Sequence, residues 1–423
     1  MNDSLILSSF GVFVDQIKEE RFLEDDGKNI KIEITLDTNE STCPNCGSFR
    51  MHRIKDYRLK KYTFVNPNGK TLIVYFRQKR FKCKDCGKTY LERNPFISNG
   101  KYKLSKDLIL LIIDKLRDSF LSVKYIAKSV GVSDHSIFNV IDEYLKFDRK
   151  KLPRFLSLDE FKAFGVESDA GKYPCVLLNT VTHQPIDIIR TRKADWMLDY
   201  FSKIPEQERL GVKYVVIDMY EPYKNIVNKM MPNAIIAIDP FHYVRYVTDA
   251  MDQTRIEIQK FYDETSKEYK ALKKNRDLLR RRRDADYSKR RKASYLGNSS
   301  YPETVLLKYV LGLSDKLADA YDMCHSFLKN YRKVTNNNGI EFLKKTISRF
   351  EGSGNKYFIE VAKTFRNWIY EINNSFIKFD NGFVLSNGPI EGTNNIIKVI
   401  KRISFGMTNF EHQRARILLH FSK

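Results

Sequence analysis

The sequence predicts a multidomain α+β protein, and three patterns along its 423 residues indicate that class. Two C-x-x-C pairs separated by β-rich sequence open the chain, and a segment with the periodicity of three short helices follows them. Strand-like and helix-like segments then alternate over residues 151–245, ahead of a long stretch that is helical in period. A chain of this length is expected to hold several domains.

The first pattern predicts a zinc ribbon over residues 1–100. "CPNCG" (43–47) and "CKDCG" (83–87) each bring two thiolates onto one tight turn, and the glycine after each pair permits a positive φ there. The expected ligands of one structural zinc ion are therefore Cys43, Cys46, Cys83 and Cys86. The alternative is four buried free cysteines that are paired by chance.

The second pattern predicts a helix-turn-helix over residues 101–150. Ser122 and Ser133 have the positions of N-caps for the second and third helices, and Gly131 supplies the turn between them. In this arrangement the third helix enters the major groove of DNA, with its first side chains near the base edges. The expected DNA contacts are Ser133, His135, Ser136 and Asn139. A three-helix unit that binds another protein is the alternative.

The third pattern predicts an α/β domain whose elements follow the order β-β-β-α-β-α-β-α. Short connections join the first three strands, which should pair antiparallel, whereas the later strands are reached through helices and should be parallel. The ribonuclease-H-like sheet, with strand order 3-2-1-4-5, fits this sequence of elements. Residues 151–245 are expected to form the first part of that domain.

In such a sheet the first and fourth strands are parallel neighbours, and here each ends in an aspartate. Asp159 ends the first and Asp218 the fourth, so their carboxylates should meet at one edge. Two acids this close repel one another unless a cation lies between them, and oxygen-only ligands favour Mg²⁺ or Mn²⁺. Glu391, in the first turn of a helix within "SNGPIEGTNNIIKVIKR" (386–402), is the expected third acid of a catalytic site for two ions.

Three other acids compete for these roles. Glu160 follows Asp159 directly but should point to the other face of the strand. Glu221 is expected to cap the helix after the fourth strand. Asp239 ends the fifth strand and would be the second acid if the strand count were off by one. A lone acid at a strand end is most often a solvated turn residue, so the prediction depends on three acids in the appropriate elements.

Charge and composition indicate a polyanionic partner. Lys and Arg number 74 against 52 Asp and Glu, a formal net charge of +22, and such a surplus favours nucleic acid. No apolar run approaches the roughly 20 residues of a membrane span. The N-terminus lacks the basic start of a signal peptide, and the paired cysteines favour metal over disulfides. The sequence therefore predicts a cytoplasmic protein that binds double-stranded DNA and no membrane.

Four segments together resemble the DDE transposases of bacterial insertion sequences, in particular the ISL-three type: "LSLDEF", "VVIDMYEPY", "AIIAIDPFHYVRYV" and "LSNGPIEGTNNIIKVIKRISFGMTNFEHQRARIL". Members of that type also begin with a zinc module and a helix-turn-helix. The resemblance implies that Asp159, Asp218 and Glu391 are the catalytic triad and that terminal inverted repeats are the DNA substrate. "DPFH" (239–242) is similar to a D-x-x-H string of several transposase groups, so Asp239 and His242 are expected to support the site. A structural role at its edge is the alternative.

Further expectations concern the C-terminal half. Residues 246–380 are predicted to form an all-helical insertion, and residues 381–423 the last part of the catalytic core. Trp368 fits a core position better than stacking on an unpaired base. Contacts with the phosphates of the DNA ends are expected from a basic run and from the face of Glu391, at Arg280, Arg281, Arg282, Arg283, Lys398 and Arg402. A solvated helix face is the alternative for the basic run.

Together these features predict a nucleoid-associated bacterial transposase. With two Mg²⁺ (or Mn²⁺) ions it would cleave DNA at a transposon end and join the freed 3′-OH to target DNA. Because two ends must be joined, a homodimer or larger assembly is expected. The alternatives are a DNA-binding regulator with an inactive transposase-like domain, and a ribonuclease-H-like nuclease that cuts without joining.

Overall fold

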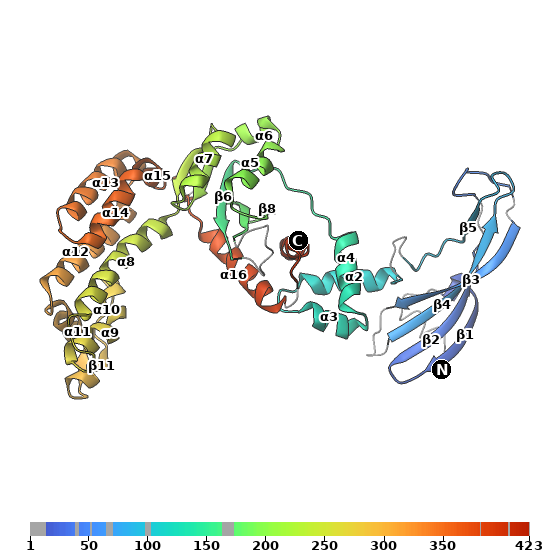
Figure 1. Cartoon of the computed structure of the whole chain (residues 1–423), viewed down its shortest axis with the longest axis horizontal. Helices are drawn as coiled ribbons and strands as arrows, with labels where there is room; N and C mark the ends of the chain where they lie inside the picture. The colour runs from blue at the N-terminus through green and yellow to red at the C-terminus, as the bar shows by residue number, and fades with distance from the viewer. Residues whose placement is uncertain are drawn as a thin grey trace. The chain divides into compact units, whose positions relative to one another are not determined.

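The structure is a computed structural model, and it describes residues 14–38, 42–50, 53–64, 71–97, 103–162, 173–380, 382–404 and 407–422. The chain divides into two compact units, and Figure 1 labels most of their elements. Unit 1 comprises residues 1–148, 164–167 and 395–423, and unit 2 comprises residues 149–163 and 168–394. Within the described ranges, no helix has both the length and the apolar composition of a membrane span.

A five-stranded sheet forms the N-terminal part of unit 1. Its strands are β1 (Ile17–Asp25), β2 (Asn29–Leu36), β3 (Arg53–Phe64), β4 (Thr71–Lys82) and β5 (Thr89–Leu91). They lie in the order β1-β2-β4-β3, with β5 paired to the end of β4. Phe64 and Leu72 pair across β3 and β4 and belong to the apolar cluster of this sheet, at the end away from the C-x-x-C turns. At the cysteine end most of β3 is exposed, so apolar packing by itself does not hold that end together.

Three helices follow the sheet, as predicted: α2 (Lys106–Arg117), α3 (Val123–Val130) and α4 (Asp134–Tyr144). The hydroxyl of Ser122 accepts a hydrogen bond from the N–H of Tyr125 at 3.0 Å, and that of Ser133 from the N–H of Ser136 at 3.2 Å. These bonds satisfy N–H groups that have no partner in the first turn of a helix. Gly131 joins α3 to α4 with a φ of 72°, which glycine adopts without strain. The predicted caps and turn are confirmed.

The C-terminal helix α17 (Phe410–Phe421) packs on α2 and α4, a contact that the sequence did not predict. Met407, Ala415 and Leu419 share one buried cluster with the cores of α2, α3 and α4. Arg416 is fully buried in the same place. Its guanidinium donates to Ser404 Oγ at 3.0 Å and to the backbone carbonyls of Asp118 and Leu121.

Arg416→Met is expected to destabilise unit 1 by roughly 3 kcal/mol, because the buried acceptors around the guanidinium would lose their charged donor. Burial lowers the pKa of Arg416 to about 10, so the side chain remains charged at neutral pH. The free energy of unfolding, measured with denaturant, checks this prediction. Arg402→Met, at an exposed position, is the control and should change that free energy by less than about 0.5 kcal/mol. Equal effects of the two substitutions would contradict the prediction.

Unit 2 contains a mixed five-stranded sheet. Its strands are β6 (Phe155–Glu160), β7 (Cys175–Asn179), β8 (Pro185–Ile189), β9 (Tyr214–Ile217) and β10 (Ile235–Ile238). β6, β7 and β8 pair antiparallel, and β9 pairs parallel with both β6 and β10, as the connection lengths predict. The order across the sheet is β8-β7-β6-β9-β10, which is 3-2-1-4-5 when the strands are counted along the chain.

The two faces of this sheet have different covers. On one face Leu156 and Leu158 of β6 share an apolar cluster with residues of α5 (Ala194–Ser202) and α7 (Glu221–Met230). On the other face Val216 and Ala237 form a smaller cluster with Leu385. The short helix α6 (Glu206–Leu210) lies between α5 and β9 in the chain. Side chains alternate between the two faces along a strand. A residue that directly follows a residue of the main cluster therefore projects from the face that Leu385 covers.

Helices make up most of the chain after β10. They are α8 (Pro240–Gln259), α9 (Lys267–Lys274), α10 (Arg276–Arg280), α11 (Glu303–Leu311), α12 (Asp315–Asn330), α13 (Asn336–Glu351), α14 (Lys356–Asn367) and α15 (Ile369–Asn374). A two-stranded sheet of β11 (Arg290–Lys292) and β12 (Ser300–Pro302) lies among them, so the prediction of an all-helical insertion is wrong in this detail. Buried residues of α8, α12, α13 and α14 share the main cluster of the β6–β10 sheet.

Helix α16 (Gly388–Ile403) begins in unit 2, whereas its residues from 395 onward group with unit 1. The sequence predicts that residues 381–423 all belong to the catalytic core, and the grouping of residues 395–423 differs from that expectation. The packing of α17 on α2 and α4 is the physical reason. Ile390, Ile397 and Ile400 are each 1% exposed and form the buried side of α16, as the helical period predicts.

Candidate functional site

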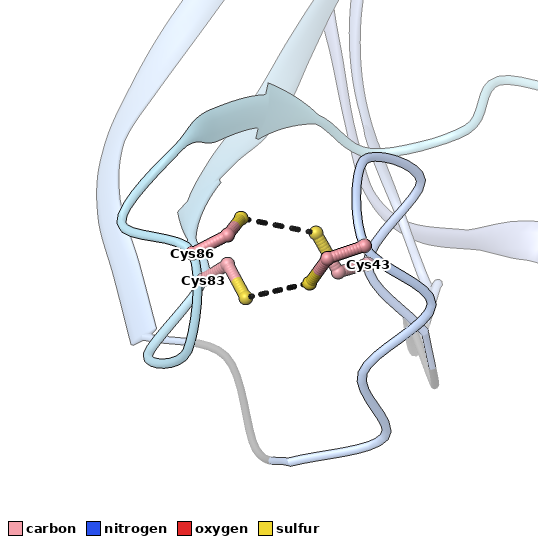
Figure 2. Close-up of side chains that lie close together, drawn as sticks. Cys43, Cys83 and Cys86 are labelled. Carbon is pink, nitrogen blue, oxygen red and sulfur yellow. Dashed lines mark hydrogen bonds between the residues drawn. The ribbon is translucent and has the colours of Figure 1, made fainter.

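The four predicted zinc ligands come together at one end of the β3–β4 ladder; Figure 2 labels three of them. The two turns that carry them have the same geometry. The N–H of Gly47 donates to the carbonyl of Cys43 at 2.9 Å, and the N–H of Gly87 to that of Cys83 at 3.1 Å. The two glycines have φ values of 71° and 68°. The turn role that the sequence predicts for both glycines is confirmed.

The four sulfur atoms have the spacing of a tetrahedral zinc site. All four lie within 4.8 Å of one another, and the Cys43–Cys86 and Cys46–Cys83 Sγ pairs are each 3.8 Å apart. Zn–S bonds of about 2.3 Å at tetrahedral angles put the sulfurs about 3.8 Å apart, whereas a disulfide requires about 2 Å. The cluster is compatible with a zinc ribbon. A closed four-thiolate site of this kind is structural rather than catalytic.

Three aspartates lie side by side at the carboxyl ends of the parallel strands of unit 2. The last paired residues of β6 and β9 come two positions before Asp159 and Asp218, so the register sets these two next to one another. The last paired residues of β9 and β10 come directly before Asp218 and Asp239, so Asp218 and Asp239 are also neighbours. All three alternate with residues of the main core and therefore project from the face that Leu385 covers.

Burial and mutual repulsion determine the protonation of this aspartate row, Asp159, Asp218 and Asp239. Burial raises the pKa of Asp159 to about 7, with added repulsion from Glu160 and Asp239. Burial raises the pKa of Asp218 to about 7 as well, with added repulsion from Glu160 and Asp159. Burial also raises the pKa of Asp239, against the opposing effects of an N–H donor and of His242. A cation beside such a row would offset the repulsion and favour the ionised carboxylates.

The N-terminal turns of α16 lie against the aspartate row. Asn394 Nδ2 donates to Asp159 Oδ2 at 2.8 Å, and the backbone N–H of Asn387 donates to Asp239 Oδ1 at 2.9 Å. Glu391 lies between the two asparagines in the chain and is exposed. Its charge is close enough to Asp239 to raise the pKa of that acid. Helix α16 therefore brings Glu391 to the edge of the sheet that carries the three aspartates.

The acids themselves do not form a compact cluster. Among the residues that the structure describes, the four cysteines form the group of potential metal ligands whose ligand atoms all lie within 4.8 Å of one another. The carboxylate oxygens of Asp159, Asp218 and Glu391 do not form such a group, so they lie farther apart than the four sulfurs. Three buried oxygens near the row nevertheless have no hydrogen-bond partner in the described part of the chain: Oδ1 of Asp218, Oδ1 of Asn387 and Oδ1 of Asn394. Buried acceptors without donors indicate a place for a cation or for its water ligands.

Asp218→Asn is expected to stabilise the protein at pH 8 in the absence of added Mg²⁺, because it removes a buried charge from a repulsive row. Folding raises the pKa of Asp218 from 3.8 to about 7, so the folded state binds the proton more tightly and loses stability as the pH rises through that window. A tenfold change in proton affinity corresponds to about 1.4 kcal/mol, so the gain at pH 8 should be about 2–4 kcal/mol and should disappear near pH 4. Denaturant unfolding of both proteins at several pH values measures it. A gain that does not change with pH would contradict the prediction.

Glu160 and Glu221, the acids that follow Asp159 and Asp218 most closely in the sequence, lie elsewhere in the structure. Glu160 is ion-paired with Arg192 and accepts a hydrogen bond from the hydroxyl of Tyr223 at 3.0 Å. Tyr223 belongs to the main core, so Glu160 points to the face opposite Asp159, as predicted. Glu221 is the first residue of α7, but Tyr220 is the N-cap and no described side chain donates or accepts a capping hydrogen bond there, so the expected capping role of Glu221 is wrong.

Asp239 and His242, the expected supporting pair, lie at the start of α8. His242 Nε2 is 3.9 Å from Asp239 Oδ2, and burial lowers the pKa of the imidazole. Asp239 accepts the N–H of Asn387, which fixes the chain just before α16. Asp239 is thus both a member of the aspartate row and the anchor of the helix that carries Glu391.

The predicted DNA contacts of the helix-turn-helix lie at the start of α4. Ser133 and His135 are exposed, and Ser136 and Asn139 are half-buried. The hydroxyls of Ser133 and Ser136 are 2.9 Å apart within the helix cap, so part of their hydrogen-bonding capacity is used there. Of these four residues, His135 therefore has the side chain best placed to reach a base edge.

The predicted arginine run does not form a free basic arm. Each of its members makes an ion pair inside unit 2: Arg280 with Asp249 at 2.9 Å, Arg281 with Glu303 at 2.5 Å, Arg282 with Asp284 at 2.6 Å and Arg283 with Asp322 at 2.5 Å. Glu303 is buried, which gives Arg281 a structural role. Lys398 and Arg402 are exposed on α16.

Trp368 is a core residue. It is 6% exposed and belongs to the main cluster of unit 2, and Lys224 Nζ lies 5.0 Å from the centre of its ring. The core position that the sequence favours for Trp368 is confirmed, and the indole face is covered from inside the protein.

Sequence reasoning missed Asn387 and Asn394 as site residues. Both stand in the segment "SNGPIEGTNN" that contains Glu391, and an amide one helical turn after the acid was the available signal. Their partners lie 148 and 235 positions away in the chain, so no local pattern identifies the contacts.

Comparison with known proteins agrees with this architecture. The family model of the ISL3-type DDE transposases, described as "Transposase", matches residues 156–417, from β6 to α17. The chain is also 23% identical over 399 residues to the transposase for insertion sequence element IS1001 of Bordetella parapertussis, with 92% of this chain and 91% of that protein covered. Since the family match spans more than half of the sequence, the chain belongs to the ISL3 family of DDE transposases.

Proposed function

We propose that this chain is the DNA transposase of an insertion sequence, which binds terminal inverted repeats, cleaves the DNA there and joins the freed 3′-OH to target DNA. Unit 2 would be its ribonuclease-H-like catalytic domain, with Asp159, Asp218 and Glu391 as the triad. The observation that carries the proposal is the hydrogen bond from Asn394 to Asp159, because it ties the helix of Glu391 to the aspartate row.

The residues of the acidic site fit Mg²⁺ or Mn²⁺. Its available donors are carboxylate and amide oxygens, the ligands that hard divalent ions select, and Oδ1 of Asp218 is buried without a partner. Asp159, Asp218 and Glu391 would hold two ions. When bound, the ions would activate the attacking oxygen and stabilise the leaving oxygen of an in-line displacement.

The remaining residues of the site orient these acids. Asn394 donates to Oδ2 of Asp159 and the backbone N–H of Glu160 donates to its Oδ1, so both oxygens are oriented, and Asp239 fixes the start of α16 through the N–H of Asn387. Water attacks the phosphodiester in the cleavage step and the 3′-OH attacks in the joining step, so the reaction requires no covalent bond to the enzyme.

Unit 1 would hold the DNA end. The start of α4 would enter the major groove, with Ser133, His135, Ser136 and Asn139 near the bases, while the zinc ribbon contacts the backbone. Lys398 and Arg402, exposed on α16, would contact phosphates. The net charge of +22 supports such binding. Joining two ends requires two copies of the site, so the active complex would be a homodimer or larger.

A cleavage and strand-transfer assay tests the proposal. The substrate is duplex DNA that brackets the coding region, with and without Mg²⁺, and a second substrate is pre-cleaved at the 3′ end. The proposal expects Mg²⁺-dependent cleavage at the end of the inverted repeat and joining of the pre-cleaved strand to a plasmid. Cleavage without joining would favour a nuclease instead, and binding without cleavage would favour a DNA-binding regulator.

A further inference from the structure

An open groove of about 360 Å³ runs along the first turns of α8 and the helix α10 in unit 2. Phe241, Arg245 and Asp249 line it from α8, and Arg276 and Arg280 from α10. Helix α8 starts directly after Asp239, the last member of the aspartate row, so Phe241 follows that acid by two residues. The Phe241 end of the groove therefore lies close to Asp239.

The lining combines an aromatic ring with positive charge. Phe241 is 56% exposed, although it belongs to the first turn of a 20-residue helix. Arg276 is ion-paired with the buried Asp252 at 2.7 Å, so Arg245 and Arg280 against Asp249 leave the lining with a surplus of one positive charge. Asp249 lies 3.3 Å from the guanidinium of Arg245 and 2.9 Å from that of Arg280. These pairs orient both guanidiniums toward one place, and exposed pairs of this kind are weak enough to yield to a phosphate.

We propose that this groove binds one nucleotide of a single DNA strand where the strand leaves the acidic site, with its base stacked on Phe241 and its phosphate held by Arg245 and Arg280. An exposed aromatic ring offers a stacking face to any base, and guanidinium groups bind phosphate oxygens in pairs. The inference rests on the proposed function, since it requires DNA at the aspartate row. It adds a site for unpaired DNA to the duplex contacts of unit 1.

The test compares the full-length protein bound to two labelled DNA ends, one a blunt duplex and one with a short single-stranded extension. Phe241→Ala and Phe241→Leu should each weaken binding of the extended end about 10-fold, because loss of one stacked base has that size of effect. Both variants should bind the blunt duplex within about twofold of wild type. Phe241→Trp should keep the affinity for the extended end, which separates loss of the ring from loss of the fold.

Phe261→Ala is the matched control, because Phe261 is 78% exposed just beyond the other end of α8 and lies outside the groove. A 2-aminopurine in the extension should be quenched by wild type and by Phe241→Trp, and not by Phe241→Leu. Wild-type affinity of Phe241→Leu for the extended end would overturn the inference, and so would an equal loss for both DNA ends. In either case the Mg²⁺-dependent cleavage by the wild-type protein would still support the proposed function, whereas absence of binding and cleavage by wild type would overturn both.

Discussion

Glu391→Gln is expected to bind the DNA end as tightly as the wild-type protein and to lose at least about 10³-fold in Mg²⁺-dependent cleavage. The amide keeps the size of the side chain and removes the negative charge that an ion requires. Because Glu391 is exposed, its replacement leaves the packing of α16 unchanged. Single-turnover cleavage of an end-labelled duplex, with binding measured separately by anisotropy, provides both quantities.

Glu221→Gln is the matched control for that experiment. Glu221 is also an exposed acid in the first turn of a helix, and it follows Asp218 by three residues. This variant should cleave within about twofold of the wild-type rate, while Asp159→Asn should lose cleavage as Glu391→Gln does. If Glu221→Gln were inactive and Glu391→Gln active, the third acid would be Glu221 and our assignment would be wrong.

Cys83→Ser is expected to abolish zinc binding by the four-cysteine cluster and to unfold the cysteine end of the N-terminal sheet. Structural zinc contributes about 10–16 kcal/mol of apparent binding free energy, as much as the whole stability of a typical domain. The apolar cluster around Phe64 lies at the opposite end of the β3–β4 ladder and does not replace that contribution. Metal analysis should find one zinc ion per wild-type chain and none in the variant, and limited proteolysis should cut the variant near residues 42–50.

Cys324→Ala is the control for zinc loss. Cys324 is a buried cysteine of α12, outside the four-cysteine cluster, so this variant should keep one zinc ion per chain and the proteolysis pattern of the wild type. Full zinc content in Cys83→Ser would show that the four thiolates do not form the site.

Much of the local structure was predictable because its signals lie in adjacent residues. Ser122, Gly131 and Ser133 determine the caps and the turn of the helix-turn-helix, since each acts on backbone groups within three or four positions. The runs that end in Asp159, Asp218 and Asp239 are short and apolar, and their helix-length connections require parallel pairing. The C-x-x-C spacing likewise determines which thiolates can share one turn.

The contacts between distant segments were not predictable in the same way. No local pattern indicated that α17 would pack on the helix-turn-helix around Arg416, or that β11 and β12 would pair. It also suggested a free basic run where the structure pairs each arginine with an acid, from Asp249 to Asp322. Whether a charge meets a partner depends on which surfaces the fold brings together.

Period, caps and residue spacing act over a few positions, so most elements of this protein, its four candidate zinc ligands and the three acids of its candidate site could be predicted from the sequence. The fold alone selected the contacts from Asn394 to Asp159 and from Asp239 to the start of α16. It also decided that residues 395–423 group with the N-terminal unit. These contacts join residues more than a hundred positions apart, and shape and burial in the folded chain select them.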